Sequence, residues 1–446
     1  MHERAGRRAV RHTPACPFRL WRVAAPAYDS RPMCLFTSPT LARSLRPLVR
    51  TVLLAASLPL TAGTLPAAAQ QADFRACVDA IRDTAVAQGV PPATAEQALR
   101  AVTPDPRVLE LDSRQPEFTL TLGRYVGNAI NAERITKGQQ MLARHRALLD
   151  PIEREYGVQA TYLVAFWGLE SGYGAFTGDF AVIRSLATLA CQTKRATFFA
   201  NELVQALKIL ARNHMTVAQM KGSWAGAMGN TQFMPSTYVN YAVDRDGDGR
   251  VDLWTSLPDV FASSANFLAK SGWKRGQPSH DEVTLPAGFD YARTDLSTER
   301  SAREWQALGV RSADGRPLGD FGERAAIALP AGYRGPAFLL WPNYKVILVW
   351  NRSQLYAISV GLLAQQIAGG PGLLRPPPSD DQPLPRDAVL DMQSRLQRLG
   401  LYGDDIDGLL GPRTRNAVRD FQVRAGVIAD GYPSPDTMTR LRAATP

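Results

Sequence analysis

The chain has 446 residues, of which 45% are hydrophobic, and its formal net charge is +10. This length allows two or three domains, and the composition is that of an ordinary globular protein. The positive charge is concentrated in residues 1–69, which hold ten of the 51 Lys and Arg residues but only two of the 41 acidic ones. Beyond them 41 basic and 39 acidic residues nearly cancel, so we expect no nucleic-acid partner.

Residues 1–69 are predicted to be a leader that contains a signal peptide. Three arginines precede an apolar run at 52–58, and a small-residue cleavage site follows at 67–69. The run is too short for a stable membrane span, and no Cys stands at the cleavage site to carry a lipid. We therefore expect an exported protein that is not a lipoprotein, with Met33 as the better start. A disordered basic arm on a cytosolic protein is the alternative.

The part that follows the leader is predicted to be mainly helical. Apolar residues recur at helical spacing in residues 73–110 and again in 138–220. Two cysteines remain after the leader, Cys77 and Cys191. An exported pair is compatible with a disulfide, but two separate buried thiols fit the sequence equally well.

One predicted helix carries the first candidate for chemistry. Residues 160–169 are apolar almost all round, which predicts a buried helix, and Glu170 stands at its C-terminal end. Burial and the negative end of the helix dipole both favour the neutral form of this carboxyl. A carboxylic acid that is protonated near neutral pH can donate a proton to a glycosidic oxygen. A helix-end glutamate that simply reaches solvent is the alternative.

Two later segments have residue types that bind sugars. Residues 223–236 combine glycines, which let the backbone approach a ligand closely, with Trp224, Gln232 and Phe233. Amides bind the N-acetyl and hydroxyl groups of sugars, and aromatic rings cover sugar faces. Residues 350–357 are again polar and aromatic, and they lead into an apolar helix.

The acidic loop at 244–252 follows the start of an EF-hand calcium loop. Asp stands at positions 1, 3 and 5, Gly at position 6, and a backbone carbonyl would serve at position 7. Position 12 is Thr255 instead of the usual bidentate Glu. The predicted ligands of a structural calcium ion are Asp244, Asp246, Asp248 and the carbonyl of Arg250. An Asp/Gly turn without metal is the alternative.

The last third of the chain changes character twice. Residues 280–349 contain short β-like runs, such as Tyr344–Val349. A Pro-rich linker is predicted at 371–384, and a compact module follows at 385–446. Helical spacing around two Asp-Gly turns predicts three helices in this module.

The order of these segments resembles the lytic murein transglycosylase B family in its soluble, exported form. The motifs that carry the resemblance are WGLESGYG (167–174), SWAGAMGNTQFMPSTY (223–238), DRDGDGRVDLW (244–254) and WNRSQLYA (350–357). The tail resembles a peptidoglycan-binding domain, because its DG, GPxT and FQ elements occur in order; an arbitrary helical bundle is the alternative. The resemblance implies a mainly α protein. Its lysozyme-like helical catalytic domain would span 70–370 with a small β-containing subdomain, and a three-helix peptidoglycan-binding module would follow.

The resemblance also implies an activity. The family cleaves the MurNAc–GlcNAc β-1,4 bond without water and leaves a 1,6-anhydro-MurNAc end. Glu170 aligns with its sole catalytic Glu, which protonates the leaving oxygen and then acts as base on the C6 hydroxyl. Typical glycosidases use two carboxylates. No second one occurs in WGLESGYG, SWAGAMGNTQFMPSTY or WNRSQLYA, and the acetamido group of the substrate can take its place.

Further site residues follow from the same resemblance. The positions that match substrate-binding residues are Tyr125, Lys194, Arg195, Ser223, Gln232, Asn351 and Tyr356. Lys194 stands where Arg is frequent and lacks the bidentate fork of Arg. Asn351 is expected to hold the acetamido group or the C6 hydroxyl, and Asp259 is the expected late calcium ligand.

The implied setting is the periplasm, where a monomer would act on glycan strands beside wall-synthesis enzymes or amidases. No cofactor is needed for the chemistry. Two rival functions remain: a lysozyme-type muramidase that hydrolyses the same bond, and a non-catalytic wall-binding or calcium-responsive scaffold. The intact motif around Glu170 argues against the scaffold.

Overall fold

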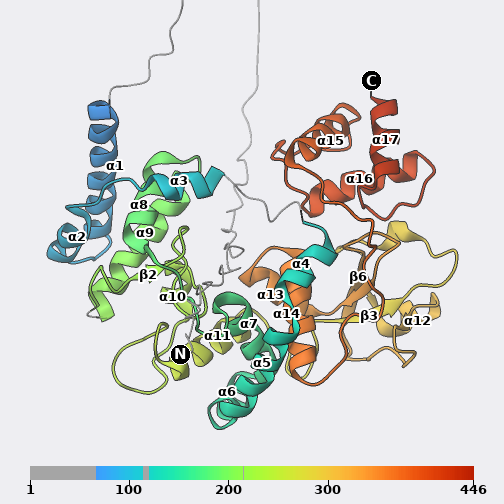
Figure 1. Cartoon of the computed structure of the whole chain (residues 1–446), viewed down its shortest axis with the longest axis horizontal. Coiled ribbons are helices and arrows are strands. Elements are labelled where there is room, and N and C mark those ends of the chain that lie inside the picture. Colours follow the sequence, from blue (N-terminus) through green and yellow to red (C-terminus); the bar gives the residue numbers. More distant parts are fainter. Residues whose placement is uncertain (1–66, 114–119, 214, 446) are drawn as a thin grey trace, which may run out of the picture.

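The computed structural model describes residues 67–113, 120–213 and 215–445. The expected leader, apart from positions 67–69, lies outside these residues. Figure 1 shows a helical lobe, a central group of helices beside a small sheet, and a C-terminal module next to that sheet. The lobe contains α1 (Ala67–Ala87), α2 (Pro92–Leu99), α3 (Pro106–Ser113), β1 (Phe180–Ala181), α8 (Val182–Gln192), α9 (Ala196–Asn213), β2 (Lys221–Gly222) and α10 (Pro235–Tyr241).

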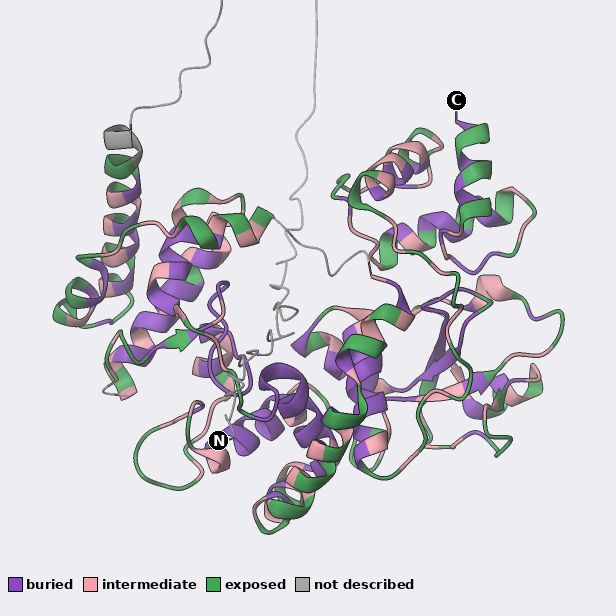
Figure 2. Ribbon diagram, viewed as in Figure 1, coloured by how far each residue is buried: buried purple, intermediate pink, exposed green. Residues whose placement is uncertain are grey.

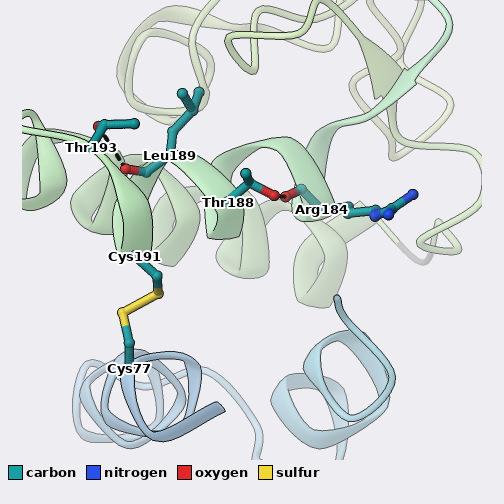
Figure 3. Close-up of a disulfide and its surroundings, with 6 residues drawn as sticks. All are labelled: Cys77, Arg184, Thr188, Leu189, Cys191 and Thr193. Atoms are coloured by element: carbon teal, nitrogen blue, oxygen red, sulfur yellow. Dashed lines mark hydrogen bonds between the residues drawn. A yellow bond between two sulfur atoms is a disulfide. The ribbon is translucent and has the colours of Figure 1, made fainter. Parts of the chain in front are cut away.

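Within the helical lobe, a disulfide joins Cys77 of α1 to Cys191 of α8 (Figure 3). The sequence left this pair open, and the structure joins it across 114 residues with the two Cα atoms 5.9 Å apart. Helix α1 also packs against α8 and α9. The bond therefore fixes the first helix to the helices that lead toward the centre of the protein.

Helix α7 (Ala160–Ser171) is buried, as its apolar sequence predicts. Eleven of its 12 residues are buried, and Figure 2 shows it in the colour of buried residues. Its neighbours include α5 (Ala132–Arg144), α6 (Arg146–Tyr156), α11 (Leu257–Lys270) and α14 (Gln354–Ile367). Gly172 ends the helix in the left-handed region, with φ of 61°. The chain therefore turns away directly after Glu170 and Ser171.

Two more helices complete the central group, α4 (Leu122–Ala129) and α13 (Pro342–Trp350). The β-like run predicted at Tyr344–Val349 is wrong, because these residues lie inside α13. Its β-branched and apolar residues show no alternation, and a short apolar run of this kind fits a buried helix as well as a buried strand. Pro342 at the first turn, where its missing N–H costs nothing, favours the helix.

The small subdomain is an antiparallel sheet with the strand order β4-β6-β7-β3-β5. Its elements are β3 (His280–Thr284), the 3-10 turn η2 (Tyr291–Arg293), β4 (Arg300–Ser301), α12 (Ala302–Ala307), β5 (Arg311–Ser312), β6 (Arg324–Ala328) and β7 (Ala337–Leu340). Trp305 and Trp341 are buried in its own apolar core. The predicted mainly helical catalytic part with a small β-containing subdomain is thus confirmed.

The C-terminal module consists of α15 (Arg386–Arg398), α16 (Pro412–Arg424) and α17 (Pro435–Ala444), as predicted. Val389, Leu396, Phe421 and Leu441 belong to a separate apolar core. Within the described ranges, no single helix is long and apolar enough to cross a bilayer. Helices α13 and α14 pass that test only as a pair, and the pair is bent by 116°.

Candidate active site

The carboxyl group of Glu170 lies buried at the C-terminal end of α7, with only 7% of the residue exposed. Its Oε1 atom accepts two hydrogen bonds, from Nε1 of Trp350 at 2.8 Å and from the hydroxyl of Tyr356 at 2.5 Å. Neither bond involves Oε2. The carboxyl group is therefore held in one orientation, with its two oxygens in different environments.

Burial dominates the acidity of this group. It raises the pKa of Glu170 to about 7, while the hydrogen bonds from Tyr356 and Trp350 act in the opposite direction by favouring the charged form. The predicted neutral carboxylic acid thus agrees with the geometry. Because the pKa is close to neutral, the same group can give up a proton and take one back.

The two donors come from helices that meet at a sharp bend. Trp350 ends α13 and Tyr356 lies in the first turn of α14, and the 116° bend between these helices brings both side chains to one oxygen. Three aromatic rings fix the indole: its ring centre lies 4.3 Å from that of Phe166 and 5.2 Å from those of Phe233 and Phe267. The indole that donates to Glu170 is thus packed against three other aromatic rings.

Tyr356 has a different position from the one expected of a sugar-binding residue. Its side chain is fully buried, and its hydroxyl points at Glu170. The structure therefore places this hydroxyl on Glu170, and a contact of Tyr356 with sugar stays a prediction. Trp350 was not singled out from the sequence, although it stands in the quoted motif six residues before Tyr356. The sequence signal that could have found it is a tryptophan at the end of an apolar run. When such a ring is buried, its indole N–H needs a hydrogen-bond partner.

Gln232 and Asn351 are nearly buried, and part of each amide is already used. Gln232 has a φ of 49°, and its Nε2 donates to the carbonyls of Thr177 at 2.9 Å and Gly229 at 2.8 Å. Asn351 accepts the N–H of Ser353 through Oδ1 at 3.0 Å. In the hydrogen bonds among the described residues, the carbonyl oxygen of Gln232 and the amide N–H groups of Asn351 remain available to a ligand.

The loop that carries Gln232 is tied down from two sides. Nε1 of Trp167 in α7 donates to Oδ1 of Asn230 at 2.8 Å. Glu202 in α9 accepts the backbone N–H of Ser236 at 2.8 Å and its hydroxyl at 2.7 Å. Glu202 is buried, and burial raises its pKa. Sequence reasoning missed this second buried glutamate, which lies on a helix with ordinary amphipathic spacing.

Tyr125 and Ser223 have less direct positions. Burial and then the carboxyl of Glu170 raise the pKa of the Tyr356 phenol, and Tyr125, half-buried in α4, adds a smaller contribution in the same direction. Ser223 closes a tight turn, because its Oγ accepts the N–H of Ala227 at 3.0 Å.

Lys194 and Arg195 follow the end of α8. Arg195 forms an ion pair with Asp112, and its guanidinium lies 4.8 Å from the ring centre of Phe199. Lys194 is exposed. Across the described part of the chain, no hydrogen bond or ion pair connects either residue to Glu170, so the structure does not join this basic pair to the carboxyl.

The acidic loop brings three of the predicted ligands together. One carboxylate oxygen from each of Asp244, Asp246 and Asp259 lies within 4.8 Å of the others. Asp248 is not part of this group; its Oδ1 accepts the N–H of Arg250 at 2.8 Å. Asp259 is only 1% exposed, and burial raises its pKa although two backbone N–H groups donate to it. A buried carboxylate beside two others is a setting that a cation would stabilise.

Comparison with known proteins identifies the family. The Transglycosylase SLT domain family matches residues 73–365, and the Putative peptidoglycan binding domain family matches residues 385–441. Membrane-bound lytic murein transglycosylase B of Escherichia coli K12 is 31% identical over 255 residues, which are 55% of this chain and 67% of that protein. The chain belongs to the lytic murein transglycosylase B family. The recognition made from the four motifs and the tail is thus confirmed.

Solved structures of this family have the same architecture. SltB3 from Pseudomonas aeruginosa, in complex with NAG-anhNAM-pentapeptide, is 45% identical, with a TM-score of 0.78. The match covers 83% of this chain and 99% of SltB3. Slt35 of Escherichia coli, in complex with calcium, is 28% identical with a TM-score of 0.57, over 67% of this chain and 93% of Slt35. The protein is a lytic transglycosylase that acts on peptidoglycan, and it therefore works in the cell envelope.

Proposed function

We propose that Glu170 alone performs both proton transfers of a non-hydrolytic cleavage of the MurNAc–GlcNAc bond. The observation that carries this proposal is a buried carboxyl with a pKa of about 7 and two fixed donors on one of its oxygens. An indole N–H can only donate, and Tyr356 is the second donor. With both lone-pair directions of Oε1 in use, the transferable proton resides on Oε2.

The two steps balance without water. The proton on Oε2 moves to the glycosidic oxygen as the bond from C1 of MurNAc to that oxygen breaks, and GlcNAc leaves as an alcohol. The acetamido group of MurNAc stabilises the positive charge that develops at C1. The carboxylate of Glu170, held by Trp350 and Tyr356, then removes the proton of the C6 hydroxyl while O6 bonds to C1. Glu170 is protonated again, and a 1,6-anhydro ring closes the cut end.

Other predicted site residues would bind the strand around this centre. We assign the free amide N–H groups of Asn351 to the acetamido carbonyl, and the free carbonyl oxygen of Gln232 to a sugar hydroxyl or N–H. Both residues are buried. Gln232 Nε2 and Asn351 Oδ1 already form hydrogen bonds within the protein, which supports a fixed geometry for the groups that face the ligand. Tyr125, Ser223, Lys194 and Arg195 remain proposals for subsites farther from Glu170.

Product analysis tests the reaction type. Digestion of sacculi by the full chain should release muropeptides whose masses are one water lower than those of hydrolysed products. The reason is that O6 of the substrate replaces water as the nucleophile. Mass spectrometry of the soluble fragments measures this difference. Reducing MurNAc ends in place of anhydro ends would assign the activity to a muramidase.

The phenol of Tyr356 should control the pH profile. In Tyr356→Phe, one donor that favours the carboxylate is lost, so the pKa of Glu170 should rise above about 7. Because the first step needs the protonated acid, the alkaline limb of kcat/KM should move to higher pH by about one unit. Tyr344→Phe is the matched control, since Tyr344 is equally buried and its hydroxyl has no partner in the described residues. Equal profiles for both variants would remove Tyr356 from the control of Glu170.

We also propose that Asp244, Asp246 and Asp259 hold a structural calcium ion. Support comes from their geometry and from the calcium complex of Slt35. At 5 mM calcium and an extracellular-type affinity of about 0.1–1 mM, the melting temperature should rise by about 2–5 °C relative to EGTA. Asp246→Asn should remove most of this shift, whereas Asp248→Asn should keep it. A calcium-independent melting curve would leave the loop an Asp/Gly turn.

The cellular setting remains a proposal in its finer points. The composition of residues 1–69 supports export to the periplasm without a lipid anchor. For the rest of the chain we propose a catalytic domain at 70–370, a linker at 371–384 and a wall-binding module at 385–446. A monomer that works beside wall synthases or amidases fits this organisation.

A further inference from the structure

The C-terminal module contains the same hydrogen-bonded unit twice. In the first copy, Gln393 donates through Nε2 to Asp407 Oδ1 at 2.8 Å and to Thr414 at 3.2 Å, and its Oε1 accepts the N–H of Gly408 at 2.8 Å. Asp407 Oδ1 also accepts the N–H of Leu409 at 2.8 Å. We call this set the first clamp.

The second clamp repeats these contacts. Gln422 donates to Asp430 Oδ1 at 2.9 Å and to Thr437 at 3.2 Å, and accepts the N–H of Gly431 at 2.7 Å. Asp430 Oδ1 accepts the N–H of Tyr432 at 2.8 Å. The two glycines have φ of 73° and 70°, and both glutamines are buried. The two turns are therefore equivalent in geometry as well as in sequence.

Their surroundings differ. In the second clamp, Asp430 uses Oδ1 for the contacts within the clamp. Its other oxygen, Oδ2, accepts the backbone N–H of Tyr333 in the catalytic domain at 2.9 Å. Arg415, on the same helix as Gln422, donates to the carbonyl of Pro330 at 3.4 Å. One Arg and one Asp thus hold both ends of the short peptide 330–333. The second clamp and Arg415 therefore bind the backbone of a peptide, and this peptide belongs to the same chain.

The bound peptide has an informative shape. Gly332 has a φ of 69°, and a Cβ placed there with L chirality would lie 2.8 Å from Asp430 Oδ2 and 3.0 Å from Cβ of Tyr432. This backbone conformation is strained for an L-residue and is the mirror image of the one that L-residues prefer, so a D-residue adopts it readily. The clamp therefore fits an amide N–H that follows either glycine or a small D-residue.

The first clamp has the same Gln, Asp, Gly and Thr, but among the described residues it receives no hydrogen bond from outside the C-terminal module. Arg386 precedes Gln393 by seven positions, as Arg415 precedes Gln422, and both Arg386 and Asp407 are exposed. Arg386 donates to the carbonyl of Asp407 at 2.9 Å, so its guanidinium lies at the turn, whereas Arg415 donates to the carbonyl of Pro330. Asp407 Oδ2 accepts no hydrogen bond from any residue that the structure describes. Stem peptides of peptidoglycan contain small D-residues and carboxylates, which suit this turn and this guanidinium.

We propose that the first clamp binds a stem peptide of peptidoglycan. Asp407 Oδ2 accepts the amide N–H that follows a D-residue, and Arg386 binds a carboxylate of the same peptide. The second clamp shows the mode of binding and is used to dock the module on the catalytic domain. This inference rests on the proposed wall-binding role of residues 385–446, and it names the ligand and the residues of that role.

The test measures co-sedimentation of the full chain with sacculi, in a Glu170→Gln background so that the ligand is not digested. Asp407→Asn keeps the shape and the Oδ1 acceptor but places an N–H donor where the ligand's N–H would arrive. Affinity should fall roughly tenfold, as expected for one hydrogen bond to a charged group. Asp405→Asn removes the same charge two residues away and should change affinity less than twofold. Equal loss in both variants, or none in Asp407→Asn, would overturn the proposal.

Two further arms separate the sources of failure. Amidase-treated glycan strands lack stem peptides, so the Asp407→Asn protein and the protein with Asp407 should bind them with equal affinity. A tenfold difference in affinity would assign the contact to a sugar acetamido group and overturn the peptide assignment. Deletion of 385–446 tests the wall-binding role itself, since unchanged sacculus binding would contradict that role first. If Asp407→Asn does not fold, NMR titration of the unmodified turn with a soluble stem tetrapeptide decides, because Gly408 should shift and Gly431 should not.

Discussion

Glu170→Gln should lower the release of soluble muropeptides from sacculi by about a thousandfold or more. The amide has the size of the acid and can still accept the hydrogen bonds of Trp350 and Tyr356, which both go to one oxygen. It has no transferable proton of suitable acidity, however, and it cannot act as the base in the second step. Both halves of the reaction would therefore fail. Turbidity loss of sacculi and chromatography of the soluble products measure the effect.

Glu202→Gln is the matched control for this experiment. Glu202 is also buried, with a raised pKa, but its carboxyl holds the start of α10 and does not contact Glu170. We expect a loss of about tenfold or less, from looser positioning of the loop with Gln232. Sacculus binding should persist in both variants. Lysis by Glu170→Gln at the unmodified rate would remove this residue from the chemistry.

Loss of the disulfide should have the largest effect on stability. The bond closes a loop of 114 residues, and its removal enlarges the unfolded ensemble. In the double variant Cys77→Ser and Cys191→Ser, the free energy of unfolding should fall by about 3–5 kcal/mol. Urea denaturation with and without dithiothreitol measures it.

The reductant supplies the control for this second result. It should lower the midpoint of the unmodified protein to that of the double variant and leave the double variant unchanged. Equal midpoints for the oxidised protein and the double variant would show that α1 is held by its packing on α8 and α9 alone.

Much of the site could be predicted because its signals are local. The apolar run before Glu170 indicated both the buried helix and the raised pKa. The spacing of Asp244 and Asp246 indicated the acidic cluster. These features depend on neighbours in the sequence, and such patterns persist when the chain folds.

Other features depend on tertiary geometry. The partnership of Trp350 and Tyr356 arises from the bend between α13 and α14, which no periodicity encodes. The buried position of Tyr356 follows from the packing of α14 against α7, and its hydrogen bond to Glu170 could therefore not be predicted from the sequence. The apolar run in α13 could not reveal its type, because burial on all sides erases both the helical and the strand pattern.

Helix α16 belongs to both clamps, with Thr414 at its start serving the first and Gln422 near its end serving the second. Neither clamp can therefore be removed as a unit without destroying the other, and a minimal functional fragment of half this module should not exist. The same sharing makes the architecture extensible. One more turn and one more helix would add a complete clamp, so duplication of only about two dozen residues would lengthen the module by one peptide-binding position.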